Sequence, residues 1–340
     1  MADVRDIIEE FTPVMREMFL SLVQAIHSEA QLGIIAAAIR DGRINDAMLA
    51  VRMSPEAFGP LDDIVRAAYI AGGRDTLAAL PAIKDPFRPG RLVVRFDQGN
   101  PRAESFMRTT AGNLIQELIG DQLKGIREVL ETSVAEGRGS RRIALDLVGR
   151  IDRTTGRRSG GIVGLHSQQM RSVEKARRML QDGDNAYFQL KSRDRRFDKA
   201  IRRQFEERGG VGAEKSSKYI ARYSDTLLRY RGERIARTEM GRAAHAGANE
   251  GMQQVIDTGA VKPQNVRKVW HATPDGRVRE SHDMLDATSI GHNEAFESPA
   301  TNALLRYPGD TSLGAQAIDV INCRCWMETR VDFLANDLGS

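Results

Sequence analysis

A stripe of apolar residues at helical spacing runs through residues 101–135 of this chain. Apolar residues that recur every three or four positions are typical of one buried face of an α-helix. We therefore predict a long helix here, within a mainly helical N-terminal region. The stripe comprises Phe106, Leu114, Ile115, Leu118, Ile119, Leu123, Ile126, Val129 and Leu130.

Shorter helical patterns, separated by short polar breaks, surround this stretch. They predict an extended helical arm rather than one compact globule. A further helix is expected to begin at Arg234. The expected helical ranges are 3–80 (with breaks), 140–150, 167–181, 194–208 and 213–232.

Strand patterns are few and short. In the N-terminal half, the β-branched run at residues 92–96 is the best candidate. Beyond about Gly259 the helical periodicity is lost, and short strands or extended segments are predicted at residues 266–270, 317–321 and 325–331.

A turn signature, Pro274-Asp275-Gly276, follows the first of these C-terminal strands. Proline and aspartate followed by glycine favour a tight turn. The turn predicts a hairpin whose two arms are residues 268–271 and 277–279. Arg277 and Arg279 would then lie on one face of the second arm.

The predicted fold class is mainly α, with a long helical N-terminal region followed by a small α+β C-terminal module. We expect a helical domain at residues 1–138 and a basic helical arm or linker at 139–230. An α+β domain follows at 231–333, and a tail at 334–340.

The composition narrows the class of protein without identifying a function. The 340 residues have a formal net charge of +4 and are 28% charged, which alone does not indicate a nucleic-acid-binding protein. We expect no secretory leader, no transmembrane helix and no membrane partner. With only 2 cysteines there is no disulfide framework, so we expect folding in a reducing cytoplasm.

Two arginine-rich blocks, at residues 138–158 and 193–203, are candidates for contact with double-stranded DNA or with an acidic protein surface. The alternative is a solvated helix face on which charges pair within the helix. The candidate residues are Arg141, Arg142, Arg153, Arg157, Arg158, Arg195, Arg196, Arg202 and Arg203.

The two cysteines are separated by a single residue, in the sequence Asn322-Cys323-Arg324-Cys325. Together with His282 they offer three soft ligands for a structural zinc ion, with His271 or Asp275 as a fourth. A metal would stabilise a small module that is rich in turns. The alternatives are two reduced cysteines packed as small apolar side chains and a strained disulfide.

An enzyme is the rival interpretation of the same residues. Cys323 or Cys325 could act as nucleophile, with His282 as base and Asp275 orienting the histidine. This would give a metal- or cysteine-dependent hydrolase, either a nuclease or a peptidase. No local signature of a cysteine hydrolase or of a phosphate-binding loop accompanies these residues, so we predict a protein that is not an enzyme.

Several motifs occur in a fixed order from about residue 231 to residue 331. This order resembles the phage Mu protein F-like family of head morphogenesis, or minor capsid, proteins of tailed phages and prophages. The residues that carry the resemblance are Arg237, Glu239, Asn249, Trp270, Asp275, Arg277, His282, Pro308, Gly309, Asp310, Asn322, Cys323 and Cys325.

The resemblance implies a few-copy virion protein, made in the bacterial cytoplasm and placed in the head interior or at the portal vertex. Its implied partners are the portal protein, the major capsid or scaffolding protein, and packaged DNA during assembly and ejection. A cytoplasmic scaffold or chaperone that never enters the virion is a second rival. Within the module, Arg237 and Glu239 are expected to serve an ion-pair network, with Arg237, Arg242 or a later arginine pairing the carboxylate.

Overall fold

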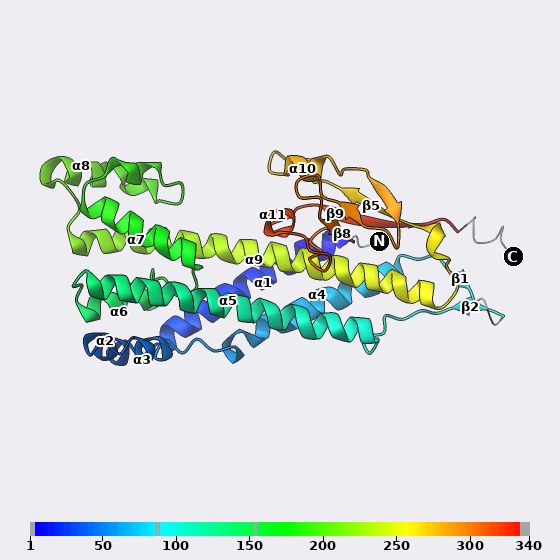
Figure 1. The fold of residues 1–340 in the computed structure, drawn as a ribbon, viewed down its shortest axis with the longest axis horizontal. Helices are drawn as coiled ribbons and strands as arrows, with labels where there is room; N and C mark the ends of the chain where they lie inside the picture. Colours follow the sequence, from blue (N-terminus) through cyan, green and yellow to red (C-terminus); the bar gives the residue numbers. More distant parts are fainter. Residues whose placement is uncertain (1–3, 86, 88, 153–154, 334–340) are drawn as a thin grey trace. The chain divides into compact units, whose positions relative to one another are not determined.

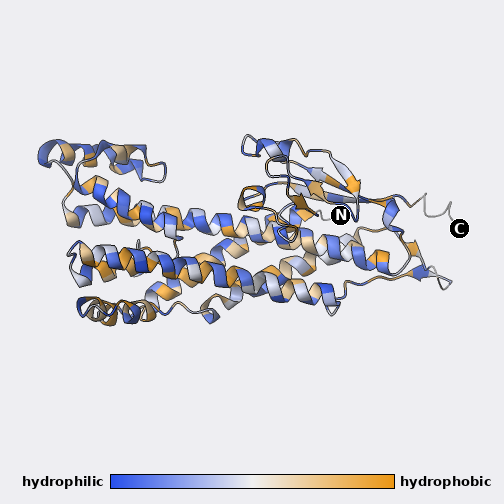
Figure 2. Ribbon diagram, in the orientation of Figure 1, coloured by the Kyte–Doolittle hydropathy of each residue, from blue (hydrophilic) through white to orange (hydrophobic). Residues whose placement is uncertain are grey.

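The computed structural model describes residues 4–85, 87, 89–152 and 155–333. Most of these residues are helical, and the strands are short and gathered in small sheets (Figure 1). The prediction of a mainly α protein with a small C-terminal α+β part is therefore confirmed. Figure 2 shows hydrophilic and hydrophobic residues interspersed along each helix, as expected of amphipathic helices.

The chain forms two compact units, each assembled from separate segments. Unit 1 comprises residues 1–16, 60–112 and 233–340, and unit 2 comprises residues 17–59 and 113–232. Three long helices contribute a segment to each unit. They are α1 (Val4–Glu29), α5 (Pro101–Ala135) and α9 (Ala213–Asp257).

Unit 2 is a helical assembly with one two-stranded ribbon, β3 (Arg150–Ile151) paired with β4 (Arg158–Ser159). Its ribbon is fastened to α9 because Asp225 accepts hydrogen bonds from Ser159 Oγ and Gly160 N, at 2.8 and 2.7 Å. Its other helices are α2 (Leu32–Arg40), α3 (Ile44–Leu49), η1 (Glu56–Phe58), α6 (Ser140–Val148), α7 (Ser167–Gln181), η2 (Asn185–Gln189), η3 (Arg195–Phe197) and α8 (Asp198–Arg208).

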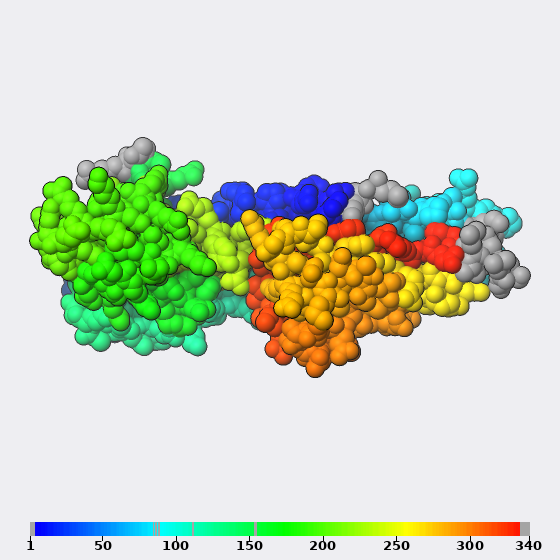
Figure 3. Space-filling view, turned by 90° about the horizontal axis from the view of Figure 1, so that it is seen from above, coloured from blue at the N-terminus to red at the C-terminus, as the bar shows by residue number. Residues whose placement is uncertain are grey.

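Unit 1 combines α4 (Gly59–Ala78) and its parts of α1, α5 and α9 with the C-terminal module. An antiparallel sheet in the order β6-β5-β9 lies at the centre of that module. The segments that follow α9 form one continuous body in the space-filling view (Figure 3). Its elements are η4 (Pro263–Asn265), β5 (Val266–His271), α10 (Glu280–Asp283), β6 (Ser289–Gly291), β7 (Phe296–Glu297), β8 (Leu304–Leu305), α11 (Ala317–Val320) and β9 (Trp326–Val331).

A buried lysine on β5 ties the loops of the module together. Lys268 is 1% exposed, and its Nζ donates to the carbonyl oxygens of Glu294 and Arg306, at 2.8 and 3.0 Å. Burial lowers the pKa of this ammonium to about 8, because charge is costly away from water. A polar side chain thus replaces apolar packing where two loops must be held against a strand.

Helices α4 and α9 approach each other so closely that only glycine fits at several positions. A Cβ added at Gly247 would lie 1.9 Å from Tyr69 O, and one at Gly72 would lie 2.2 Å from Ala244 O. A Cβ at Gly251 would likewise lie 2.8 Å from Gly73 O. Backbone touches backbone along this seam, because the facing side chains are hydrogen atoms.

Helix α9 corrects the prediction that one helix ends near Gly232 and another begins at Arg234. The structure has a single helix from Ala213 to Asp257. One glycine costs a helix only about 1 kcal/mol, and no proline or capping break follows it. Arg237 and Glu239 therefore lie in the middle of a helix and not at its start.

The predicted strand at residues 92–96 is also wrong beyond its first residue. Only β2 (Arg91–Leu92) pairs, with β1 (Ile83–Lys84). Val94 packs into the apolar cluster around Met252 and Val255, and Phe96 covers the site where a Cβ on Gly73 would lie. Of the two β-branched residues in this run, Val94 is thus partly buried, whereas Val93 is 76% exposed.

Two predictions in the C-terminal module are wrong. Strand β5 pairs with β6 and β9, and not with residues 277–279, so the expected hairpin and the shared face of Arg277 and Arg279 do not form. Residues 317–320 form α11, not a strand, and its carboxylate Asp319 caps the helix start. Strands β5 and β9 themselves confirm the ranges predicted around residues 266–270 and 325–331.

In the part of the chain that the structure describes, no single helix has the length and apolar character needed to cross a membrane. One bent pair, α1 with α2, meets that test when the two helices are taken together, by length and composition only.

The glycine seam yields a stability prediction. Gly247→Ala places a methyl group against the Tyr69 carbonyl, so we expect about 3 kcal/mol of destabilisation and a clearly lower Tm. Gly241→Ala is the matched control, because Gly241 lies in the same helix with nothing within 4 Å of a Cβ. The control should be neutral or slightly stabilising. Equal urea midpoints for the two variants would show that the seam is not tightly packed.

Candidate functional site

The site begins with the turn that precedes β9. Asn322 adopts a positive φ of 58°, a conformation that asparagine tolerates better than most residues. Its backbone N–H donates to Thr238 Oγ1 of α9 at 2.8 Å, and its Oδ1 accepts from Arg237 at 3.5 Å. The turn is thereby fixed on α9 immediately before the first cysteine.

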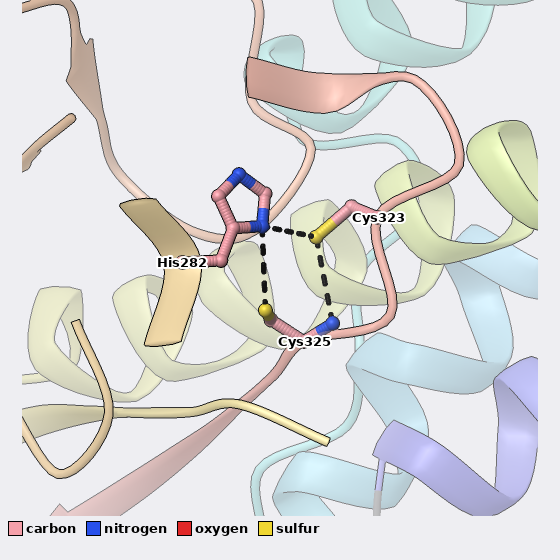
Figure 4. A group of neighbouring side chains, drawn as sticks. All are labelled: His282, Cys323 and Cys325. Atoms are coloured by element: carbon pink, nitrogen blue, oxygen red, sulfur yellow. Dashed lines mark hydrogen bonds between the residues drawn. The ribbon is translucent and has the colours of Figure 1, made fainter. Parts of the chain in front are cut away.

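The two cysteines and His282 form one compact group. His282 Nδ1 lies 3.4 Å from Cys323 Sγ and 3.4 Å from Cys325 Sγ (Figure 4). His282 lies on the short helix α10, and Cys325 directly precedes β9. His282 and Cys325 are each 3% exposed, whereas Cys323 is only partly buried.

The two thiols differ in their tendency to ionise. Hydrogen bonds from Cys325 and from His282 hold the pKa of Cys323 well below its ordinary value, although burial opposes this. The hydrogen bond to Cys323 and burial both raise the pKa of Cys325. The pair therefore favours one thiolate, on Cys323, beside a neutral thiol.

The spacing of the three ligand atoms fits a tetrahedral ion. The Nδ1 and two Sγ atoms all lie within 4.8 Å of one another. Zinc bonds of ~2.3 Å to sulfur and ~2.05 Å to nitrogen imply an Nδ1–Sγ edge of about 3.6 Å, close to the 3.4 Å found here. His282, Cys323 and Cys325 could therefore hold a zinc ion without large movements.

The structure does not bring either predicted fourth ligand into this group. His271 Nε2 lies 3.0 Å from Glu328 Oε2, and its ring stacks on Trp326. Asp275 forms an ion pair with Arg324, in which Asp275 Oδ2 lies 2.7 Å from a guanidinium nitrogen. In this geometry the three ligands leave one tetrahedral position for a group from outside the described chain, such as water.

Asp275 is also not placed to serve a cysteine hydrolase. Its carboxylate binds Arg324 and the backbone N–H of Arg277, so it does not orient the His282 ring. Trp270 fills that role sterically, because its fully buried indole meets His282 edge-on at 5.6 Å.

The cysteines lie on the wall of a cavity of about 420 Å³ in unit 1. One face of α1 and one face of α9 form two of its sides, and the turns around Pro274, Gly309 and Arg324 form the others. Of the residues carrying the sequence motifs, those that line the cavity are Arg237, Pro308, Gly309, Cys323 and Cys325. Motif residues far apart in sequence thus converge on one place.

Other motif residues support the cavity from behind. Glu239 is buried and pairs with Arg242, one of the partners expected for it, whereas Arg237 pairs with Glu233. Burial works to raise the pKa of Asp310, but hydrogen bonds from Arg306 and Ser312 outweigh it and lower that pKa.

Two motif residues do not take part in the cavity. Asn249 lies farther along α9, and its buried Oδ1 has no partner among the described residues. Arg277 is exposed on the loop after Pro274. Neither position suggests contact with the cysteine–histidine group.

The arginine blocks of unit 2 divide into buried and exposed members. Asp146, 3% exposed in its side chain, lies 3.1 Å from Arg150 and 3.3 Å from Arg177 and also pairs with Arg138. Arg142 and Arg158 donate to backbone carbonyls. These arginines stabilise the unit.

The remaining candidates have exposed side chains. Arg196 pairs with Asp194, Arg203 pairs with Glu207, and Arg202 lies over the Phe188 ring at 3.9 Å. Arg141, Arg157 and Arg195 are also exposed. Arg153 lies outside the described residues.

Sequence reasoning missed the contribution of the first helix to the cavity. Arg5, Glu9 and Arg16 line it from α1, and Arg16 lies 3.2 Å from Glu233 of α9. These charges lie on one helix face at spacings of four and seven residues. That pattern alone does not distinguish a cavity wall from a solvated face.

Residues 196–328 match the family model described as Phage Mu protein F like protein. The match confirms the resemblance predicted from the motifs and covers less than half of the chain. An NAD(+)–arginine ADP-ribosyltransferase, EFV, of Enterococcus faecalis is 32% identical over 105 residues, which are 31% of this chain and 20% of that protein. This chain therefore spans about a fifth of the length of that curated relative. No solved structure matches.

The ligand group yields a metal-binding prediction. We expect the purified protein to bind one zinc ion, and His282→Ala and Cys325→Ala each to weaken binding more than about 100-fold, since each removes a direct ligand. His271→Ala is the control and should retain zinc, because its ring is held by Glu328. Zinc content by mass spectrometry and Tm with and without a chelator are the measurements. Loss of zinc in His271→Ala would contradict the three-ligand geometry.

Proposed function

We propose that this protein is a minor capsid, or head morphogenesis, protein of a tailed phage or prophage that binds the portal protein. The observation that carries the proposal is the Mu protein F-like match over residues 196–328. That match includes the motif residues that converge on the cavity, so one structural feature and one family assignment coincide. Phage head morphogenesis is the role that the match itself suggests, and it implies a virion protein.

A binding role fits the chemistry of the motif residues. Arg237 donates to Asn322 of the turn before β9, and Arg237 and Glu239 form ion pairs within α9, with Glu233 and Arg242. Pro308 and Gly309 shape a loop against α9, where Gly309 adopts a φ of +87°. Residues of this kind hold a surface in one shape, which favours recognition of a partner over turnover.

Packaged double-stranded DNA is the second proposed partner. Its contact surface would be the exposed arginines around η3 and α8, since most arginines of the 138–158 block bind carboxylates or carbonyls within unit 2. Arg195 and Arg202 are the exposed arginines of the 193–203 block that form no ion pair with a carboxylate among the described residues. Contact with phosphate would be independent of sequence.

The alternative is a metal- or cysteine-dependent hydrolase centred on His282, Cys323 and Cys325. The observation in its favour is that His282 Nδ1 touches both thiols, with a partly exposed Cys323 facing a cavity. The His282→Ala variant separates the two roles. A structural group predicts a lower Tm, whereas a catalytic group predicts a protein that keeps its Tm and loses hydrolysis of peptide or DNA substrates.

Portal association can be tested by co-expression with the portal protein of the same phage or prophage. We expect native mass spectrometry to show a stable complex of the two proteins. In purified particles, we expect fewer copies of this chain than of the major capsid protein. Bound zinc would appear in the same spectrum as an added mass. A monomeric chain that is absent from purified particles would contradict the proposal and favour a cytoplasmic scaffold or an enzyme.

DNA contact can be tested through its salt dependence. We expect weak binding to duplex DNA of any sequence, with an affinity that falls steeply between about 50 and 200 mM salt. Arg195→Gln and Arg202→Gln should each reduce the slope of log K against log salt by about 1. Arg43→Gln, an exposed arginine of the same unit that pairs with Asp41 and Asp46, is the control. Absence of binding at low salt would exclude DNA and leave the portal role standing.

A further inference from the structure

The cavity beside the cysteine–histidine group is unusually rich in arginine. Five arginines from three parts of the chain line it: Arg5 and Arg16 from α1, Arg237 and Arg242 from α9, and Arg324 from the turn between the cysteines. The carboxylates on its wall are Glu9 and Glu233. Two further carboxylates, Glu239 and Asp275, pair with Arg242 and Arg324.

Histidine adds no positive charge here. His245 lines the cavity but is buried, and its Nε2 accepts from the backbone N–H of Met327 at 3.2 Å. Its Nδ1 lies 2.6 Å from Gly241 O and donates to it. With one nitrogen donating and the other accepting, the ring is neutral. The positive charge of the cavity therefore comes from guanidinium groups, which remain charged at any physiological pH.

The arginines retain donors that the chain does not use. Arg242 Nε is buried and has no hydrogen-bond partner among the described residues, and a buried donor without an acceptor is destabilising. Arg324 forms an ion pair with Asp275 through one nitrogen, although a guanidinium carries five N–H donors. Arg324 lines the cavity and is 24% exposed in its side chain, so its remaining N–H groups can meet an acceptor that enters.

The size of the cavity indicates more than a free ion. A volume of about 420 Å³ falls in the range of small-molecule sites, which run from about 300 to 1,000 Å³. Apolar groups of Ile8, Pro274 and Trp326 share the wall with the arginines. The lining therefore suits a ligand with one anionic end and one apolar end.

We propose that this cavity binds the carboxylate or phosphate group of an organic ligand, with Arg242 and Arg324 as its main hydrogen-bond donors. Arginine forms paired, charge-assisted bonds with either oxyanion. Arg5 adds electrostatic attraction, Arg16 and Arg237 share the single carboxylate of Glu233, and the apolar wall holds the organic part. The site is independent of portal or DNA binding, so it stands or falls separately from the proposed function.

Phenyl phosphate and benzoate are matched probes, because they share a ring and differ in the anionic group. Titration calorimetry on the full-length protein at about 50 mM salt should show saturable binding of at least one of them, with benzamide as the uncharged control. Binding of phenyl phosphate alone identifies a phosphate ligand, and binding of benzoate alone identifies a carboxylate ligand. Because Trp326 lines the cavity, tryptophan fluorescence should change on binding.

Arg242→Gln and Arg324→Gln should each raise the Kd of the probe that binds by about tenfold or more. This is the loss of affinity expected for one charged hydrogen bond. Arg330→Gln is the control, since Arg330 lies on β9 outside the cavity in an exposed pair with Glu328. If Arg242→Gln unfolds because Glu239 loses its partner, the Arg324→Gln variant provides the test. Its partner Asp275 is 31% exposed in its side chain, so water can solvate that carboxylate when the ion pair is lost.

Three results would overturn the proposal. The first is no binding of either probe by the wild-type protein up to about 10 mM, which corresponds to ~3 kcal/mol of binding free energy. The second is a folded Arg324→Gln variant that binds the probe with the same Kd as the wild-type protein. The third is binding abolished by a chelator yet unaffected by Arg324→Gln, which would place the anion on a metal ion instead of the arginines.

Discussion

The contact on which unit 1 depends is the backbone-to-backbone packing of α4 against α9. Gly72, Gly247 and Gly251 leave no room for a side chain, so the two helices have one permitted spacing and rotation. Close-packed interiors transmit such constraints, because displaced atoms find no free volume. The face that α9 turns toward α1 and the C-terminal turns is thereby fixed.

That fixed face organises everything that makes the site. Thr238 holds the backbone of Asn322, and His245 holds the backbone of Met327 at the start of β9. The two contacts lie on either side of the cysteines, so a rigid helix sets the position of Cys323 and Cys325 from both ends. His282 reaches them from α10, which is attached to the same sheet through the buried Trp270. Ligand groups on rigid supports keep their spacing better than those on free loops.

Local patterns in the sequence predicted the long helix α5, strands β5 and β9, and the grouping of His282 with the two cysteines. They failed where long-range packing decides. The apolar residues Val94 and Phe96 suggested a strand but pack on helices, and the Pro274-Asp275-Gly276 turn suggested a hairpin although β5 finds better partners in β6 and β9. The cavity could not be foreseen because Arg5 and Arg16 are more than 200 residues from Glu233, the first cavity residue of α9, and their spacing also fits a solvated surface.

The metal group and the arginine cavity share a wall, and their charges are consequently coupled. Without metal, the cysteine pair favours one thiolate, which opposes an anion in the cavity. A bound zinc ion would deprotonate both thiols and cancel their charge, so the field at Arg324 would become more positive by about one elementary charge. Groups this close, in partly buried surroundings, interact far more strongly than in water. An occupied metal group would therefore strengthen anion binding, and a bound anion would in turn favour the metal, because such linkage is reciprocal.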